Sequence, residues 1–266
     1  LVHRAHELGL TDTKLLNQQE LFAMEPNHKL NAMGAIYFAC DGHLYPAKLM
    51  HQLIDDLKSK GVQFKMNEAV VNFEKGGGKI NSVITNAHKY KADAVVLATG
   101  SWSRELAEQL DINLPLMPGR GYSITLEDTP YRTNYPAVFI EGRVAITPMD
   151  TNKMRFGGTM EITTTDAAPR INRVVGILKA VKRYFPEFDI PVPTMDKVWY
   201  GYRPCSADGL PYLGRTKKWN NLVMATGHSM VGLSLGAGTG KLVSEIIDEK
   251  PTSIDISFYN PERFDH

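Results

Sequence analysis

The stretch "ATGHSMVGLSLGAGTG" at 225–240 is the most glycine-rich part of the chain, and glycine loops before a helix can hold phosphate groups. Two phosphate-binding patterns can be tested against it. A P-loop ending at Gly240-Lys241 requires a glycine where the chain has Leu235, and a Ser or Thr where it has Leu242. The dinucleotide fingerprint requires a glycine or alanine at the position of Lys241. Neither pattern fits, so the glycines need another reason.

The residues around these glycines predict a strand, a turn and a helix. The strand "NLVMAT" ends before a turn at Gly227-His228, and a helix follows over about 230–249. In that helix Gly232, Gly236 and Gly240 fall on one face, because residues four apart are neighbours on a helix surface. Two interpretations are open. The face packs tightly on a sheet, or the positive N-terminus of the helix points at an anionic or electron-rich ligand.

Composition excludes several classes of protein. The chain has 266 residues, 43% of them hydrophobic, so it can bury a core in one or two domains. With 30 basic and 29 acidic residues it shows no electrostatic signature of nucleic-acid binding. Its apolar runs are shorter than a membrane span, and Cys40 and Cys205 form no metal-binding or disulfide pattern. We therefore predict a soluble protein without a metal, in which both cysteines are small buried residues.

The order of the elements predicts an α/β chain with a β-rich insertion. An amphipathic helix is expected from Pro46 to Gly61, and another over 171–185 with Ile171, Val174, Val175, Leu178, Val181 and Phe185 on its apolar face. From about Leu114 the residue pattern becomes that of antiparallel strands, and near Asn221 the α/β pattern returns. The strands are expected at "VQFKM", "AVVNFEK", "KINSVITN", "DAVVLATG", "GYSITLED", "AVFIEGRVAITPM", "KMRFGGTMEI", "KVWYGYRP" and "NLVMAT".

Five stretches in this order resemble the D-amino-acid oxidase/dehydrogenase (DAO) family of FAD-dependent oxidoreductases, and most of all its D-amino-acid dehydrogenases. They are "GAIYFACDGHLYPAKLMHQLIDDLKSKGVQ", "ADAVVLATGSWS", "LPLMPGRGYSITLE", "RVAITPMDTNKMRFGGTMEI" and "GYRPCSADGLPYLG…NNLVMATGHSMVGLSLGAGTG". The resemblance implies an incomplete FAD/NAD(P)-binding Rossmann-like domain with an inserted antiparallel-sheet substrate domain. The partial FAD-binding domain is expected at 51–113 and 206–250, and the substrate-binding domain at 114–205 with part of 1–50.

The resemblance also implies which residues contact the cofactor. In such proteins the turn and helix start matching Thr226 to Ser234 lie against the flavin ring, where a helix N-terminus stabilises the negative charge of a reduced flavin. The strand end "ATGSWS" runs beside the cofactor, and "NEAVV" matches the stretch near its adenine. The expected cofactor contacts are Val70, Thr99, Gly100, Trp102, Gly227, His228, Gly232 and Leu233.

Arg203 in "GYRP" matches the position at which relatives hold the substrate carboxylate, and a guanidinium can bind both carboxylate oxygens at once. We expect it to face the substrate cavity, within reach of Tyr122 or His228. Tyr122 and Tyr202 are further substrate-binding candidates, as hydroxyl donors or packing walls. Some amine-oxidising relatives carry a second arginine where this chain has Met230, which favours dehydrogenase-like over glycine-oxidase-like chemistry.

The implied function is oxidative deamination of D-amino acids with FAD. A sarcosine- or proline-type amine oxidase is one alternative, and a non-catalytic folded fragment without cofactor is another. Family members open with a strand, Gly-x-Gly-x-x-Gly and a helix that hold the FAD pyrophosphate, and this sequence contains no such motif. We therefore expect the chain alone to bind FAD weakly, to be inactive and to expose a sheet edge that favours self-association. The expected location is cytoplasmic, with peripheral attachment to the inner face of the membrane as an alternative.

Overall fold

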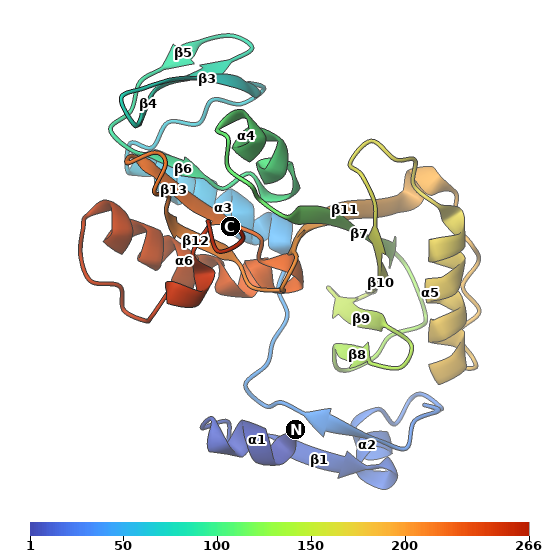
Figure 1. The fold of residues 1–266 in the computed structure, drawn as a ribbon. Coiled ribbons are helices and arrows are strands. Elements are labelled where there is room, and N and C mark those ends of the chain that lie inside the picture. Colours follow the sequence, from blue (N-terminus) through green and yellow to red (C-terminus); the bar gives the residue numbers. More distant parts are fainter. Residues whose placement is uncertain (266) are drawn as a thin grey trace. The chain divides into compact units, whose positions relative to one another are not determined.

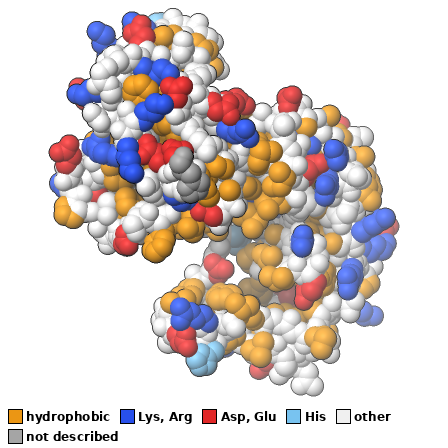
Figure 2. Space-filling model, viewed as in Figure 1, with side chains coloured by type: hydrophobic (Ala, Val, Ile, Leu, Met, Phe, Trp, Pro, Cys, Tyr) orange, Lys and Arg blue, Asp and Glu red, His pale blue; other side chains and the backbone are white. Residues whose placement is uncertain are grey.

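The computed structural model describes residues 1–265 and combines helices with four small sheets (Figure 1). The chain divides into two compact units, each made of three segments. Unit 1 consists of Leu1–Gln63, Gly121–Thr159 and Ala168–Tyr200, and unit 2 of Phe64–Arg120, Met160–Ala167 and Gly201–His266. Charged side chains of both signs are interspersed on the face shown in Figure 2, as expected for a net charge of +1.

Unit 1 combines five helices with antiparallel strands. Its helices are α1 (Val2–Glu7), α2 (Gln18–Met24), α3 (Pro46–Ser59), α5 (Ile171–Tyr184) and the short η2 (Met195–Lys197). Its complete strands are β1 (Lys14–Asn17), β2 (Gly34–Tyr37), β8 (Ala137–Phe139) and β9 (Val144–Met149). β1 pairs antiparallel with β2 and β8 antiparallel with β9.

A five-stranded sheet has the order β11-β7-β10-β9-β8. Its remaining strands, β7 (Leu116–Leu126), β10 (Lys153–Ile162) and β11 (Val198–Ser206), each contribute residues to both units. "GYSITLED" and "KMRFGGTMEI" thus supply neighbouring strands of one sheet, as the sequence predicts. β10 and β9 are antiparallel, with Phe156 opposite Ile146.

The core of unit 1 forms where α5 packs along this sheet (Figure 1). The buried face of α5 is formed by Val174, Ile177, Leu178, Val181 and Tyr184. These side chains pack with Ile146 and Phe156 of the strands, and with Phe185. The predicted apolar face of α5 is therefore confirmed at Val174, Leu178, Val181 and Phe185, but Ile171 begins the helix and is exposed.

Unit 2 contains the parallel strand pair. Its strands are β3 (Val70–Gly76), β4 (Lys79–Thr85), β5 (Lys89–Tyr90), β6 (Val95–Leu97), β12 (Tyr212–Arg215) and β13 (Leu222–Thr226). Its helices are α4 (Ser103–Gln109), α6 (Gly232–Ile247) and the short η1 (Gly100–Trp102), η3 (Ser229–Val231) and η4 (Ser257–Tyr259). β3, β4 and β5 form an antiparallel sheet, while β13 pairs parallel with β6 and antiparallel with β12. α6 packs on β12 and β13, and α4 on β3 (Figure 1).

Three local predictions are wrong. "VQFKM" forms no strand, and its Val62 and Met66 are exposed, because no other strand of the chain pairs with it. The strand predicted at 93–100 shortens to β6, the edge strand of its sheet, and Val96 is exposed on it. Cys40 is exposed after β2, while Cys205 is partly buried as a free thiol. The helix predicted from Pro46 is confirmed as α3, although none of its residues is buried.

The hairpin sheet is joined to the parallel pair by the amide of Asn221. Its Oδ1 accepts a hydrogen bond from the backbone N–H of Ile80, and its Nδ2 donates to the Ile80 carbonyl, both at 2.9 Å. Asn221 and Ile80 are both buried, so no water replaces these bonds if the amide is lost. One side chain thereby imitates a pair of ladder hydrogen bonds.

We predict that Asn221→Ala lowers the free energy of unfolding by about 1–3 kcal/mol, because two buried backbone groups lose their partners. Urea unfolding followed by circular dichroism measures the loss. The neighbouring Asn220→Ala is the matched control, since Asn220 is exposed. Equal stability of the two variants would show that the Asn221 amide does not hold the sheets together.

Candidate functional site

The chain reverses sharply at Gly227, directly after β13. Its φ of 83° lies in the left-handed region that glycine adopts without strain. A Cβ built on Gly227 would lie 2.8 Å from Cδ2 of Tyr212, whose side chain is fully buried on β12. Both the backbone angle and the space therefore require glycine at this turn.

The turn leads through η3 into the N-terminus of α6. The first N–H groups of a helix have no partner within the helix and carry a partial positive charge. α6 runs for 16 residues, so its dipole is well developed at Gly232. This part of the site can stabilise an anionic or electron-rich group.

A second turn, at the end of β6, lies against the first. The Thr99 hydroxyl is 3.0 Å from that of Ser103, which in turn is 2.8 Å from that of Thr226. Thr226 also donates to the carbonyl of Gly100 at 3.2 Å, and Gly100 has a left-handed φ of 56°. A chain of hydroxyl groups thus joins the carboxyl ends of the two parallel strands, where α/β proteins place ligands.

Sequence reasoning missed Ser103 in this network. The signal was present, because Ser103 follows Thr99 by four residues at the start of a helix and falls next to it in space. The Ser101 hydroxyl beside it is buried and has no hydrogen-bond partner among the described residues. It remains available to a ligand or a water molecule at this turn.

His228 connects the turn to α6. Its Nε2 lies 2.9 Å from the Thr239 hydroxyl, and its backbone forms an isolated antiparallel bridge with Cys205. Burial lowers the pKa of the His228 imidazole below its ordinary value, because a charged ring is disfavoured away from water. The ring is therefore neutral at pH 7. Thr239, which sequence reasoning missed, holds its orientation.

We predict that His228 makes the protein less stable in acid. Because its folded pKa is lowered, the unfolded chain binds the proton more readily, and stability falls as the pH drops below about 6.5. His228→Gln can still hydrogen-bond to Thr239 but does not titrate. Urea unfolding at about pH 7.5 and about pH 5 should show a smaller acid-induced loss in the variant than in the wild type. An identical loss in both proteins would assign the acid sensitivity to other histidines.

A cavity of about 360 Å³ adjoins this turn in unit 2. It is lined by Val96, Ala98, Ala225, His228, Gly232, Gly236, Thr239, Gly240 and Val243. The three helix glycines that share a face in the sequence therefore share one cavity wall. The carboxyl end of β6 and the adjoining part of β13 provide the rest.

Two of the predicted substrate residues, Arg203 and Tyr202, are neighbours on β11. Arg203 on β11 is about half buried, and burial lowers the pKa of its guanidinium from the ordinary value. The Tyr202 hydroxyl donates to the Thr165 carbonyl at 2.8 Å, and its ring meets the ring of Trp102 edge-on with centroids 6.1 Å apart. Arg203 and Tyr202 both belong to unit 2.

The other predicted residues lie in several different elements. Tyr122 is buried in the core of unit 1, where its hydroxyl accepts a hydrogen bond from the backbone N–H of Arg170 at 3.0 Å. Val70 begins β3 opposite Thr85. Leu233 is 52% exposed in the first turn of α6. The sequence-predicted residues that the structure brings together are Thr99, Gly100 and Trp102 at the second turn, and Gly227, His228 and Gly232 at the first.

These residues fit one part of an FAD molecule. A Cβ built on Gly100 meets no atom within 4 Å, so the backbone of that turn is open. The N-terminus of α6 suits the electron-rich edge of a flavin ring, and Ser101 has a spare hydroxyl. The pyrophosphate has no glycine loop of the Gly-x-Gly-x-x-Gly type in this sequence. The fit is therefore to the ring end of the cofactor.

Other kinds of site find little support. The described residues contain no group of three or more His, Cys, Asp or Glu side chains placed to hold a metal ion. Over residues 1–265, every helix is too short or too polar to span a membrane.

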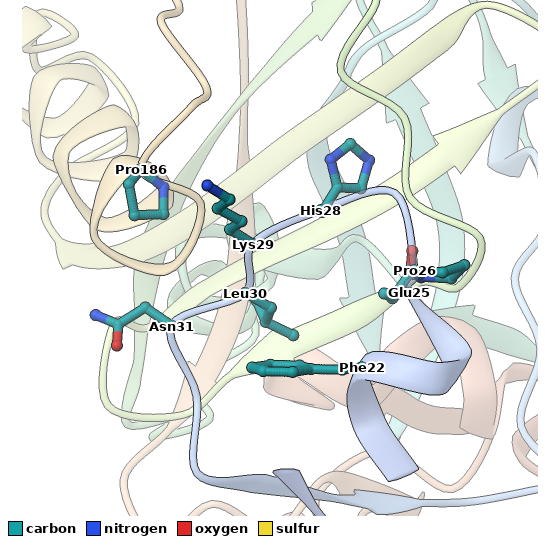
Figure 3. Close-up of a pocket in the computed structure, with 8 residues that line it drawn as sticks. All are labelled: Phe22, Glu25, Pro26, His28, Lys29, Leu30, Asn31 and Pro186. Atoms are coloured by element: carbon teal, nitrogen blue, oxygen red, sulfur yellow. The ribbon is translucent and has the colours of Figure 1, made fainter. Parts of the chain in front are cut away.

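A second cavity, of about 430 Å³, lies in unit 1 and contains none of the predicted site residues (Figure 3). Phe22 and Leu30 face each other across it, and the Lys29 side chain extends toward Pro186. Both Glu25 carboxylate oxygens accept backbone N–H groups of Asn134 and Tyr135. The His28 ring contacts the Arg132 carbonyl and the Glu187 carboxylate. The polar side chains are therefore used to hold this segment in the fold.

Comparison with known proteins gives consistent matches. The model of the "FAD dependent oxidoreductase" (DAO) family matches residues 1–246. D-amino acid dehydrogenase of Neisseria meningitidis serogroup C (strain 053442) is 35% identical over 203 residues, which are 74% of this chain and 47% of that protein. The enzyme of the same name from Helicobacter pylori is 29% identical over 237 residues, 88% of this chain and 56% of that protein. The chain thus spans about half the length of the curated relatives it matches.

Two solved structures share the fold over nearly the whole chain. Glycine oxidase from Geobacillus kaustophilus aligns with a TM-score of 0.88 at 25% identity, covering 98% of this chain and 70% of that one. L-proline dehydrogenase from P. horikoshii aligns with a TM-score of 0.88 at 21% identity, covering 99% of this chain and 71% of that one.

Proposed function

Because the chain belongs to the FAD-dependent oxidoreductase (DAO) family, we propose that it forms the substrate-binding and flavin-ring part of an enzyme that oxidises D-amino acids. One observation carries the proposal. The two glycine turns at Gly100 and Gly227 are tied together by hydroxyl groups at the carboxyl ends of the parallel strands β6 and β13. The curated relatives named D-amino acid dehydrogenase support this choice of substrate class.

When bound, FAD would supply the acceptor for the hydride that leaves the substrate Cα. The chain's own residues would bind and orient the flavin ring and the substrate. Gly227 holds the turn tightly against Tyr212, and the N-terminus of α6 would stabilise negative charge on the ring. His228, neutral and hydrogen-bonded to Thr239, keeps this turn in place without adding a charge.

Arg203 is the proposed anchor for the substrate carboxylate. A half-buried guanidinium is well suited to this role, because an ion pair strengthens as water is excluded, and its planar fork binds two oxygens. Anchoring the carboxylate directs the Cα hydrogen toward the flavin. Tyr202, held by its bond to Thr165, is proposed to shape the wall beside Arg203, and Tyr122 to support the sheet from the core. An amine that arrives deprotonated requires no general base from the protein, and we assign none.

The roles of the two units follow from this proposal. Unit 2, with the parallel strands and the glycine turns, would carry the flavin-contacting residues. The antiparallel part of unit 1 would belong to the substrate-binding domain. Val70, Trp102 and Leu233 remain predicted cofactor contacts, with Val70 near the adenine end. A cytoplasmic location, or attachment to the inner face of the membrane, also remains a prediction.

A sarcosine- or proline-type amine oxidase is the alternative, since the solved structures with this fold include a glycine oxidase and an L-proline dehydrogenase. Met230 supports the D-amino-acid reading, because it stands where some amine-oxidising relatives carry a second arginine, and its exposed thioether cannot form an ion pair. The test is to assay the complete gene product with D-amino acids, L-proline and sarcosine, using an artificial electron acceptor or hydrogen peroxide as the readout. Acceptor reduction with D-amino acids supports the proposal. Peroxide release with sarcosine or L-proline would support the alternative.

A further inference from the structure

An arginine near the end of the described chain has every N–H group of its guanidinium hydrogen-bonded. The five N–H groups of Arg263 donate hydrogen bonds at distances from 2.8 to 3.2 Å. Two of them form a bidentate pair with the Asp208 carboxylate. The others go to the backbone carbonyls of Leu210, Pro211 and Asn260. The Arg263 side chain is only 14% exposed, so water screens these contacts little.

Most of these hydrogen bonds hold the loop between β11 and β12. The loop comprises residues 207–211 and connects the strand that carries Arg203 with the strand that begins at Tyr212. Hydrogen bonds from Arg263 lower the pKa of the Asp208 carboxyl, so the carboxylate is ionised and the pair persists at neutral pH. One side chain therefore fixes how β11 passes into β12.

The same guanidinium lies over the ring of Tyr212. Its central carbon, Cζ, is 4.1 Å from the ring centroid, which is a cation–π contact. Tyr212 is fully buried, and its hydroxyl donates to the Pro115 carbonyl at 2.7 Å. The ring is therefore held at its hydroxyl and on one face.

An edge of the Tyr212 ring packs against the Gly227 turn. A Cβ built on Gly227 would lie 2.8 Å from Cδ2 of Tyr212, so the turn and the ring are in close contact. Tyr212 also stands opposite Thr226 in the β12–β13 ladder, and the Thr226 hydroxyl connects the two glycine turns. The position of the ring thus restricts the position of the turn. Arg263 reaches the turn through a single intervening side chain.

We propose that Arg263 is a positioning residue for the Gly227 turn and acts on it through Tyr212. The consequence for the cofactor rests on the proposed function, which assigns this turn to the flavin ring. Loss of Arg263 releases the loop at 207–211 and one face of the Tyr212 ring, and the turn then moves more freely. The affinity for FAD therefore depends on a residue that lies behind the flavin turn.

The first test measures hydrogen exchange of the backbone N–H groups of residues 226–230 in the complete gene product, prepared without FAD. Arg263→Ala should accelerate this exchange about tenfold, because the turn opens more often when the Tyr212 ring is not held. Arg263→Lys keeps a charge opposite Asp208 but loses the planar fork, so its exchange rate should be intermediate. This variant also retains the test if the alanine variant does not fold.

Arg215→Ala is the matched control. The Arg215 guanidinium also donates to backbone carbonyls of unit 2, at the C-terminal end of α6 and just before β13. None of these hydrogen bonds goes to Tyr212 or to the loop at 207–211. Arg215→Ala should therefore lower the free energy of unfolding but leave exchange at residues 226–230 unchanged while the protein is folded.

Two further measurements separate positioning from a general loss of stability. Titration with FAD, followed by flavin fluorescence, should give a dissociation constant about tenfold higher for Arg263→Ala and unchanged for Arg215→Ala. In a Tyr212→Leu background, Arg263→Lys should change neither hydrogen exchange nor FAD affinity any further. The intervening ring is then absent, and residues that act through one contact are not additive.

The proposal is overturned if both Arg263 variants exchange at residues 226–230 as slowly as the wild type, or if Arg215→Ala accelerates exchange equally. Additive effects of Arg263→Lys and Tyr212→Leu would also overturn it, because Arg263 would then not act through Tyr212. Faster exchange in the Arg263 variants of a protein that binds no FAD would support the positioning role, while contradicting the proposed function.

Discussion

Gly227→Ala is expected to lower the free energy of unfolding by about 2–5 kcal/mol, from two separate costs. A left-handed backbone costs an alanine about 1–2 kcal/mol, and a methyl group forced into a packed core costs about 1–3 kcal/mol. The added Cβ would lie 2.8 Å from the Tyr212 ring. That ring cannot move aside easily, because its hydroxyl donates to the Pro115 carbonyl at 2.7 Å and the Arg263 guanidinium lies 4.1 Å above its centre.

Gly209→Ala separates the two costs. Gly209 has a φ of 81°, nearly the same as Gly227, but a Cβ built on it meets no atom within 4 Å. The free energy of unfolding of Gly209→Ala should therefore fall only by the cost of the left-handed backbone, about 1–2 kcal/mol. Urea unfolding of both variants measures the difference. Equal losses would mean that Tyr212 does not restrict the turn, and that the proposed flavin site is less rigid than its contacts indicate.

Arg203→Ala in the complete gene product is expected to raise KM for a D-amino acid about 10- to 100-fold, because a charge-assisted pair is worth about 1.5–3 kcal/mol. Arg203→Lys keeps the charge but loses the planar fork, so its KM should fall between those of the wild type and the alanine variant. Steady-state kinetics with an artificial electron acceptor provide the measurement.

Arg104→Ala serves as the control for a general change of charge, because Arg104 is exposed and pairs with Glu108 on the surface of α4. Its KM should remain that of the wild type. If Arg203→Ala also leaves KM unchanged, the carboxylate anchor lies elsewhere, and the assignment of Arg203 by resemblance is wrong.

The sequence predicted those elements whose signals are local. The apolar positions of α5 recur at helical spacing and are buried, apart from Ile171 in the exposed first turn and the partly buried Val175. The strands predicted at "AVVNFEK" and "KINSVITN" form the antiparallel pair β3 and β4, because hairpin partners are close in sequence. The strand "VQFKM" failed for the opposite reason. Its apolar pattern is strand-like, but a strand needs a hydrogen-bonded neighbour, and no segment of this chain supplies one.

In the candidate site, too, the features with local sequence signals were predicted, whereas the contacts between distant segments were not. Gly227 is visible in the sequence, but the reason for it is Tyr212, which approaches from another strand. The hydroxyl chain through Ser103 and Thr226 depends on two strand ends that only the folded sheet brings together. Thr239 lies about two turns into α6 and contacts His228, which precedes the helix, and spacing alone does not single out this pair. Sequence reasoning therefore located the turns, while the contacts that hold them required the structure.

The most direct test of the central claim is the visible absorbance of the purified complete gene product, recorded without oxygen before and after a D-amino acid is added. We predict a bound-flavin spectrum that bleaches with a D-amino acid and persists with its L-enantiomer. In the proposed function the turns at Gly100 and Gly227 hold the ring, and Arg203 orients the substrate beside it. A product with no bound flavin, or a flavin that no D-amino acid reduces, would contradict this account.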